Sequence, residues 1–256
     1  MRYNGCAIPA ILGDDFGLSG PQMKPLSENL PVVILACKVF SGLLEKYLPE
    51  ELTGRITYLD YGLHEAPRKL KTALQEAIDS IEVPSLVVLG YGLCGNGLDG
   101  LKAGKNALLV PRADDCIALL LGSNQAYQEQ FFSMPGTYWL SKGWLEVGSN
   151  PLNEYHEYIE KYGLAQADWL VDTQYKNYKR LAFVSHEPND LETYRPLVRE
   201  IAEFCARWDM IYEEILGSEE YIRRLCQACQ DTSQLDDDFI LVPPGGELKQ
   251  GLFLRR

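Results

Sequence analysis

Short apolar runs that alternate with helical segments are the feature that most limits what this chain can fold into. The segments between them have helical periodicity; in 64–82, for example, Leu70, Leu74 and Ile78 fall on one helical face. Continuous Val, Ile and Leu runs separated by helices are typical of parallel strands covered on both faces. The strand-like segments are 31–37, 55–64, 85–90, 106–111, 180–186, 210–216 and 239–244, with an edge strand predicted at 137–144.

This alternation predicts an α/β fold with mostly parallel, Rossmann-like sheets and helices on both faces. The helical stretch from 150 to about 175 is interpreted as a connector between two lobes. We therefore expect a cysteine-bearing α/β lobe over 1–165, a smaller α/β lobe over 166–256 and a cleft between them. Single helices are predicted after the first strand, over 41–52, and over 113–132. The pattern leaves open whether the lobes share one sheet.

Charge and hydropathy exclude two classes of partner. The formal net charge of -12 would repel a phosphate backbone, so no nucleic-acid partner is expected. No apolar run approaches the roughly 18 residues of a membrane span. The apolar stretch near the N-terminus is too short for a signal peptide, and Asp14 and Asp15 follow it, so a cytoplasmic location is expected. The seven cysteines are an odd number, which in a reducing compartment favours metal binding, catalysis or plain burial over disulfides.

Four residues with metal-binding side chains follow four consecutive strands of the predicted sheet. Cys37 ends the first strand, His64 the second, Cys94 follows the third and Cys116 follows the fourth. Ligands of open parallel sheets bind beyond the carboxyl ends of the strands. Thiolates bind iron–sulfur clusters, zinc and other soft metals. We therefore predict a metal site formed by Cys37, Cys94 and Cys116, with His64 as a nearby ligand or proton donor. Burial as small apolar side chains is the alternative.

Glycines surround Cys94 in the segment "GYGLCGNG". Gly92, Gly95 and Gly97 permit positive φ and close approach of a cofactor, and the N–H groups of Gly95 and Gly97 are expected to be free to meet it. Cys116 is predicted to begin a helix, whose N-terminus would lower the pKa of the thiol.

Two charged residues precede Cys116. Asp114 or Asp115 is expected to cap the predicted helix, and Arg112 to hold an anionic ligand or pair with an aspartate. His64, Arg112 and Asp115 are therefore the candidate catalytic residues.

A second hypothesis is a small-molecule-binding module or a cofactor-free thiol enzyme. Cys94 would be its nucleophile, His64 or His186 its base, and the cleft between the lobes its binding site. A third is a structural partner whose cysteines are merely buried. The CxxC spacing of Cys226 and Cys229 falls inside a predicted helix and is interpreted as an accident of the helix surface. The glycine loop lacks the lysine pattern of a nucleotide-binding loop.

The segments "LVVLGYGLCGNGLDGL", "LLVPRADDCIALLLGS" and "GTYWLSKGW" resemble the family known as domain of unknown function 1638. "VILACKVF" and "HEAPRKL" also match its pattern. The resemblance covers most of the chain and is most specific over 31–144. By motif position it implicates the following residues, with Trp144 as a stacking wall in a cofactor site: Cys37, His64, Cys94, Arg112, Asp115, Cys116 and Trp144.

The family occurs mainly in anaerobic bacteria and methanogenic archaea, often encoded near corrinoid-dependent methyltransferases. The resemblance therefore implies a role accessory to anaerobic corrinoid or methyl-transfer metabolism. It implies a corrinoid protein or methyltransferase as a partner, and it adds a corrinoid to the cofactors that the cysteines predict, which are an iron–sulfur cluster or another soft metal.

Overall fold

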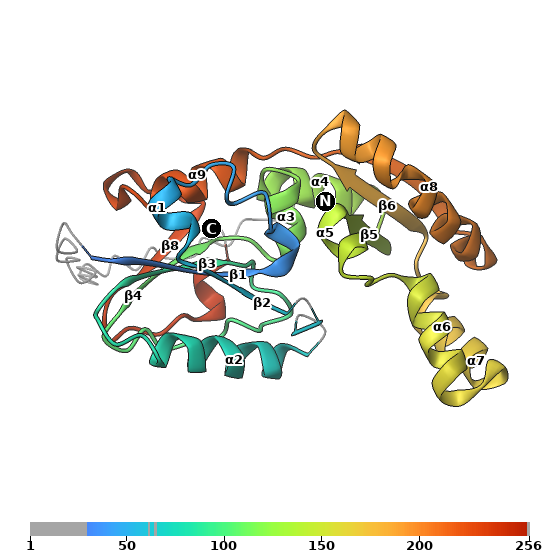
Figure 1. The fold of residues 1–256 in the computed structure, drawn as a ribbon, viewed down its shortest axis with the longest axis horizontal. Coiled ribbons are helices and arrows are strands. Elements are labelled where there is room, and N and C mark those ends of the chain that lie inside the picture. The colour runs from blue at the N-terminus through green and yellow to red at the C-terminus, as the bar shows by residue number, and fades with distance from the viewer. Residues whose placement is uncertain (1–29, 61, 64–65, 255–256) are drawn as a thin grey trace, which may run out of the picture.

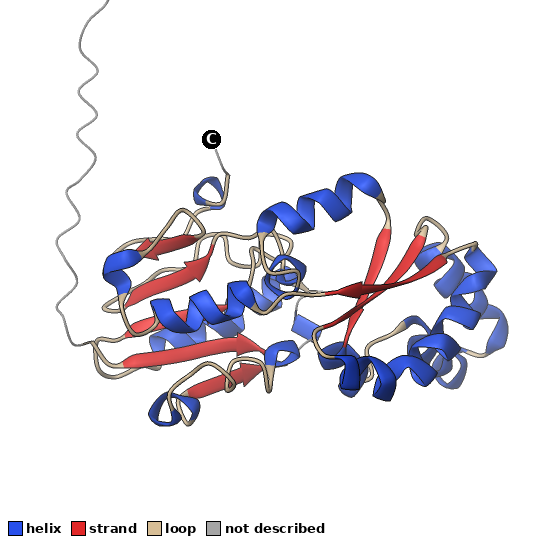
Figure 2. Ribbon diagram, turned by 90° about the horizontal axis from the view of Figure 1, so that it is seen from above, coloured by secondary structure: helices blue, strands red, loops and turns tan. Residues whose placement is uncertain are grey.

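The computed structural model describes residues 30–60, 62–63 and 66–254, and it has an α/β fold with two separate sheets (Figure 1). The strand order is β2-β1-β3-β4-β8 in the first sheet and β5-β6-β7 in the second. Figure 2 shows the two sheets side by side, each with helices packed around it. The predicted fold class is confirmed, and the lobes do not share a sheet.

The first sheet contains four parallel strands and one antiparallel strand. Its central strands are buried on both faces because their side chains are apolar without alternation. The C-terminal strand β8 pairs antiparallel with β4, with Leu109 opposite Leu241. The strands are β1 (Val32–Cys37), β2 (Ile56–Leu59), β3 (Leu86–Gly90), β4 (Ala107–Pro111) and β8 (Phe239–Val242).

Helices cover both faces of this sheet. Figure 1 shows α2 (Pro67–Asp79) under one face and α1 and α9 over the other. The expected face of α2 is buried: Leu70, Leu74 and Ile78 are fully enclosed. The remaining helices of this lobe are α1 (Glu50–Thr53), α3 (Cys116–Leu120), α4 (Asn124–Ser133) and α9 (Glu220–Ala228).

The second sheet has three parallel strands with its own hydrophobic core. The middle strand β6 is buried along its whole length, whereas the edge strand β7 is largely exposed. Gly163, with φ +81°, separates two twelve-residue helices. The elements are β5 (Thr137–Ser141), α5 (Lys142–Glu146), α6 (Pro151–Tyr162), α7 (Leu164–Tyr175), β6 (Arg180–Ser185), α8 (Pro188–Cys205) and β7 (Ile211–Leu216).

The chain passes from the first sheet to the second and returns. It enters the second sheet at β5, where the predicted edge strand lies, and comes back through α9, whose buried side chains belong to the first core. Residue 165, the predicted lobe boundary, falls at the start of α7. The division into domains at that residue stays a prediction. The first 29 residues of the predicted lobe 1–165 lie outside the described ranges.

Two predicted helices differ from the observed ones. The helix predicted over 113–132 is two helices, because Gly122 takes φ +87° and the Ser123 hydroxyl accepts the Ala126 N–H at 3.0 Å to begin α4. The helix predicted over 41–52 is not continuous: residues 41–47 form turns after the 3-10 helix Lys38–Phe40, and only the short α1 follows Pro49. None of the helices within the described ranges has the length and hydropathy that a membrane span requires.

Candidate functional site

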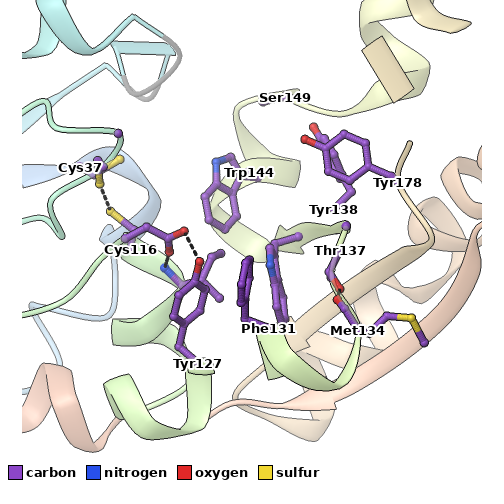
Figure 3. Close-up of a pocket in the computed structure, with 16 residues that line it drawn as sticks. Cys37, Cys116, Tyr127, Phe131, Met134, Thr137, Tyr138, Trp144, Ser149 and Tyr178 are labelled. Carbon is purple, nitrogen blue, oxygen red and sulfur yellow. Dashed lines mark hydrogen bonds between the residues drawn. The ribbon is translucent and has the colours of Figure 1, made fainter. Parts of the chain in front are cut away.

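A pocket of about 460 Å³ lies where the carboxyl ends of the first sheet meet elements that lead into the second (Figure 3). One side is formed by Cys37 at the end of β1, Cys94 after β3, and Cys116 at the start of α3. The other side comes from α4, β5 and α5. The volume is within the range of small-molecule sites, and the position follows the rule for open parallel sheets.

Three thiols meet at this pocket. The Sγ atoms of Cys94 and Cys116 are 3.3 Å apart, and the Cys37 side chain hydrogen-bonds with that of Cys116. All three side chains are less than a tenth exposed. The expected meeting of these sulfurs at one sheet edge is therefore observed. Their role as metal ligands stays a prediction.

Contacts between thiols, together with burial, keep Cys37 and Cys116 in the protonated form. The hydrogen bond with Cys116, followed by burial, raises the pKa of Cys37 far above its ordinary value. The hydrogen bond with Cys37 lowers the pKa of Cys116, but the hydrogen bond with Cys94 and burial outweigh it, so this pKa also stands well above its usual range. The prediction that the helix N-terminus lowers the pKa of Cys116 is wrong, because burial among neighbouring thiols dominates.

Cys94 is held in an unusual backbone conformation. Cys94, Gly95 and Asn96 have φ of 46°, 61° and 69°, so three consecutive residues lie in the left-handed region. Such conformations cost free energy for residues other than glycine and persist where the surroundings enforce them. The Cys94 N–H donates to the Asp114 carbonyl at 3.0 Å, which ties this loop to the segment that carries Cys116.

The three glycines near Cys94 have different roles. Only Gly95 lines the pocket. A Cβ on Gly92 would lie 2.5 Å from the Asp115 carbonyl carbon, and a Cβ on Gly97 would lie 2.8 Å from Leu70 Cδ2. The Gly97 N–H donates to the Cys94 carbonyl at 3.1 Å, so the prediction that it is free for a cofactor is wrong. Close packing explains why Gly92 and Gly97 are glycine, and their cofactor role stays a prediction.

The candidate catalytic residues are not equally placed. Asp115 lines the pocket and caps α3: Oδ1 accepts the Ile117 N–H at 2.6 Å, and Oδ2 accepts the Tyr127 hydroxyl at 3.2 Å. Arg112 is not among the lining residues, and its backbone N–H donates to the Asp238 carbonyl at 2.7 Å. His64 lies outside the described residues.

Aromatic side chains form most of the far wall, and Trp144 was the only one that the sequence singled out. Tyr127 and Phe131 lie one turn apart on α4, and their ring centroids are 6.2 Å apart. Figure 3 shows the ring of Trp144 directed toward the space that these two rings border. The four-residue spacing on α4 and the aromatic-rich segment 137–144 were the signals available in the sequence.

Tyr91 is a second residue that sequence reasoning missed. Its side chain is 1% exposed, and its hydroxyl has no hydrogen-bond partner among the described residues. Burial first, and then the charges of Cys37, Cys116 and Cys94, raise the pKa of this phenol. A buried hydroxyl without a partner costs about 1–3 kcal/mol, which a nearby anionic sulfur would relieve.

The other described cysteines lie away from the pocket. Cys205 is enclosed in the second core, and Cys226 and Cys229 are buried in the first. The Cys229 thiol donates to the Leu225 carbonyl at 3.0 Å. The prediction that the CxxC pair lies on a helix surface is wrong, because this face of α9 packs against the first core.

The thiols as they stand do not surround an ion. Within the described ranges, no group of three or more His, Cys, Asp or Glu side chains is arranged so that it could hold a metal. Two sulfurs bound tetrahedrally to one zinc at about 2.3 Å are separated by about 3.8 Å. The Cys94–Cys116 pair at 3.3 Å would therefore have to open slightly to admit an ion.

Comparison with protein-family models gives one match, over residues 58–226, to the family described as "Protein of unknown function (DUF1638)". The match covers more than half of the chain. The chain belongs to the DUF1638 family. The matched segment contains Cys94, Cys116, Tyr91 and the aromatic wall, whereas Cys37 precedes it. No curated protein and no solved structure matches the chain.

Proposed function

We propose that this DUF1638 protein binds one soft metal ion through Cys37, Cys94 and Cys116, with a fourth coordination position that opens into the pocket. One observation carries the proposal: three thiols from three separate elements gather on the pocket wall, where those of Cys94 and Cys37 each contact that of Cys116. Three protein ligands with an open position are typical of catalytic rather than structural zinc sites.

The raised pKa values support an ion as the missing partner. The hydrogen bond with Cys116 and burial keep the thiol of Cys37 protonated, and the hydrogen bond with Cys94, burial and charge repulsion do the same for Cys116. A divalent cation reverses this balance, because thiolates that repel one another are each attracted to it. The left-handed backbone at Cys94 supports the same proposal, since strained conformations cluster at ligand sites.

The spacing of the sulfurs favours a single ion over an iron–sulfur cluster. In a cluster each cysteine commonly binds a different iron, so the full width of the cluster separates the sulfurs. Cys94 and Cys116 are in contact instead. Thiolate ligands suit Zn²⁺ or Cu⁺ best among single ions.

Tyr91 would complete the surroundings of the ion. Its buried hydroxyl lies in the electrostatic neighbourhood of all three thiols. A hydroxyl that donates to a metal-bound thiolate stabilises its negative charge, as outer-shell hydrogen bonds commonly do at metal sites.

The alternative is thiol chemistry without a metal. The Cys94–Cys116 contact favours it, because two thiols in contact need little movement to form a disulfide. A nucleophilic Cys94 would also need a base. His186, one of the bases considered, hydrogen-bonds the Leu120 carbonyl at 2.8 Å and lines a different, smaller cavity. This arrangement favours the metal proposal.

The proposal extends to the setting of the protein. A role accessory to anaerobic corrinoid-dependent methyl transfer, with a corrinoid protein or methyltransferase as partner, rests on the family resemblance alone. A metal-bound thiolate facing an open pocket would suit it, because metal binding keeps the sulfur deprotonated at neutral pH. A corrinoid ring is larger than the ligands that a 460 Å³ pocket encloses, so it would meet the pocket from outside. A cytoplasmic location belongs to the same proposal, since reduced thiols need a reducing compartment.

Metal analysis of the full chain tests the proposal. After anaerobic purification and reconstitution we expect about one ion per chain and, with Co²⁺ as the probe, a thiolate-to-cobalt charge-transfer band. Cys116→Ser should lose both, whereas Cys205→Ala, a change at a buried cysteine of the second core, should keep both. No bound metal, or equal binding by Cys116→Ser, would overturn the proposal. Iron with inorganic sulfide would replace the single ion by a cluster.

A further inference from the structure

We propose that the pocket beside the three thiols binds a small alkylated cation, such as a quaternary ammonium or sulfonium group. The inference deepens the proposed function, because it names the class of ligand that would occupy the space over the metal ion. It rests on three properties of the pocket: its aromatic walls, the sign of its charge and its size.

The aromatic walls suit an alkylated cation. Tyr127 and Phe131 border the space from α4, and Trp144 borders it from α5 (Figure 3). Ring faces carry negative charge density, and a cation within about 6 Å of several ring centroids is attracted to all of them. Alkyl groups on the cation also gain from contact with the rings, whereas a hydrated ion such as sodium would lose its water without replacement.

A cation already occupies part of this aromatic wall. The Arg180 guanidinium lies 5.4 Å from the ring centroid of Trp139, a further lining residue, and pairs with Glu213 at 2.7 Å. Arg180 itself does not line the pocket. One face of Trp139 is therefore engaged by Arg180, and Tyr127, Phe131 and Trp144 supply further rings on the wall of the pocket.

The charge of the pocket excludes anions. Among the described lining residues Asp115 is the only one with a formally charged side chain, and none is Lys, Arg or His. Burial first, and then the charge of Asp115, raise the pKa of Tyr127, so this ring stays a neutral phenol at physiological pH. Three thiolates on one divalent ion would carry a net charge of about -1, which adds to that of the carboxylate. A cation is therefore the charge type that the pocket favours.

The size of the pocket favours a small ligand. A volume of about 460 Å³ is near the lower end of the range for small-molecule sites. A quaternary ammonium group with a short substituent fits this volume, whereas a large planar cofactor does not.

A pair of isosteres separates charge from shape. Isothermal titration calorimetry with choline and with its uncharged carbon isostere, 3,3-dimethyl-1-butanol, measures what the positive charge adds. We expect choline to bind at least about 5-fold more tightly, the lower part of the range for cation–π attraction. Equal or tighter binding of the alcohol, or no binding of either probe, would overturn the inference.

Variants assign the effect to residues. Trp144→Leu should weaken choline binding about 10-fold, and Asp115→Asn, which keeps a capping side chain on α3, should weaken it several-fold while leaving the alcohol unaffected. Phe132→Leu is the matched control, because Phe132 neighbours Phe131 on α4 but is 75% exposed and does not line the pocket. Equal effects of Asp115→Asn on both probes would contradict the charge argument even if Trp144→Leu fails to fold.

The same samples distinguish failure of this inference from failure of the metal proposal. Metal content is measured before each titration, and titrations are repeated on reduced, metal-free protein. Preference for choline in a protein that binds no metal would overturn the proposal of a metal site and support the proposal of a cation site. Bound metal without a preference for choline over the alcohol would support the metal site and overturn the cation site.

Discussion

Cys37, Cys94 and Cys116 at the pocket and Cys205, Cys226 and Cys229 on the two C-terminal helices are all buried and all free thiols. They differ in what surrounds them. At the carboxyl ends of parallel strands, the thiols of Cys37 and Cys94 each contact that of Cys116, whereas each of the other three cysteines is packed mainly among apolar side chains. Burial of a cysteine therefore does not indicate its role, whereas contact with other thiols distinguishes the cysteines of the pocket from those of the cores.

The causes of the raised pKa values differ in the same way. Burial alone raises the pKa of Cys205 to about 12, while the hydrogen bond with Cys116 is the largest cause at Cys37. A cation can relieve repulsion between neighbouring thiols, but it cannot reach a thiol enclosed by hydrocarbon. Four experiments test whether the two groups of cysteines differ in this way.

Metal should stabilise the protein through the pocket cysteines alone. With free Zn²⁺ about a thousandfold above its dissociation constant, the free energy of unfolding should rise by about 4 kcal/mol. Cys116→Ala should lose this increment, and Cys205→Ala should keep it. Urea unfolding with and without zinc, under reducing conditions, measures both. An equal increment in the two variants would place the metal elsewhere.

Metal affinity should rise steeply with pH. The pKa values of Cys37 and Cys116 are raised, so both groups hold protons at neutral pH and release them when an ion binds. Displacing these two protons makes the affinity rise at least about 100-fold, or about 2.7 kcal/mol, for each pH unit until the pH passes these pKa values. Calorimetry in buffers of different ionisation enthalpy counts the protons. An affinity independent of pH would mean that these thiols are not the ligands.

Serine should be tolerated better at the pocket than in the second core. Cys205 is 0% exposed among apolar neighbours, so Cys205→Ser should lower the free energy of unfolding by about 1–2 kcal/mol. Cys94 lines a pocket, and Cys94→Ser should cost less than about 1 kcal/mol in the metal-free protein. Urea denaturation of both variants gives the order, and the reverse order would show that Cys94 is packed as a core residue.

Glycine and alanine should rank oppositely at the two kinds of position. The φ of 46° at Cys94 is unfavourable for residues with a Cβ, so Cys94→Gly should be more stable than Cys94→Ala by about 0.5–1 kcal/mol. Cys205 is the last residue of α8, where alanine should be favoured by up to about 1 kcal/mol. Thermal unfolding of the four variants measures this, and alanine preferred at both positions would contradict the left-handed backbone at Cys94.

Much of the fold could be predicted because it depends on local pattern. The buried runs at β1, β3, β4 and β6 are read directly from their apolar residues, and α2 from its periodicity. The division between α3 and α4 could also have been found, since Gly122 followed by Ser123 is a stop and a cap in succession. The apolar residues before Gly122 favoured the prediction of one continuous helix instead.

The pairing of strands could not be predicted in the same way. The apolar run of β8 looks like the others, but it lies antiparallel beside β4 in the first sheet after the chain has left the second. An apolar run predicts that a strand is buried, but it does not predict which strand lies beside it, because several pairings would bury the same side chains.

The α/β layers, and the positions of Cys37, Cys94 and Cys116 after buried strands, can be predicted from the amino-acid sequence, because both depend on the order of residues along short segments. Three further features follow from the packing of the folded chain: the thiols of Cys37 and Cys94 contact that of Cys116, Tyr91 is buried near them, and rings from α4 and α5 form the opposite wall of the pocket. These arrangements arise from contacts between segments far apart in the chain, whose packing no local pattern specifies.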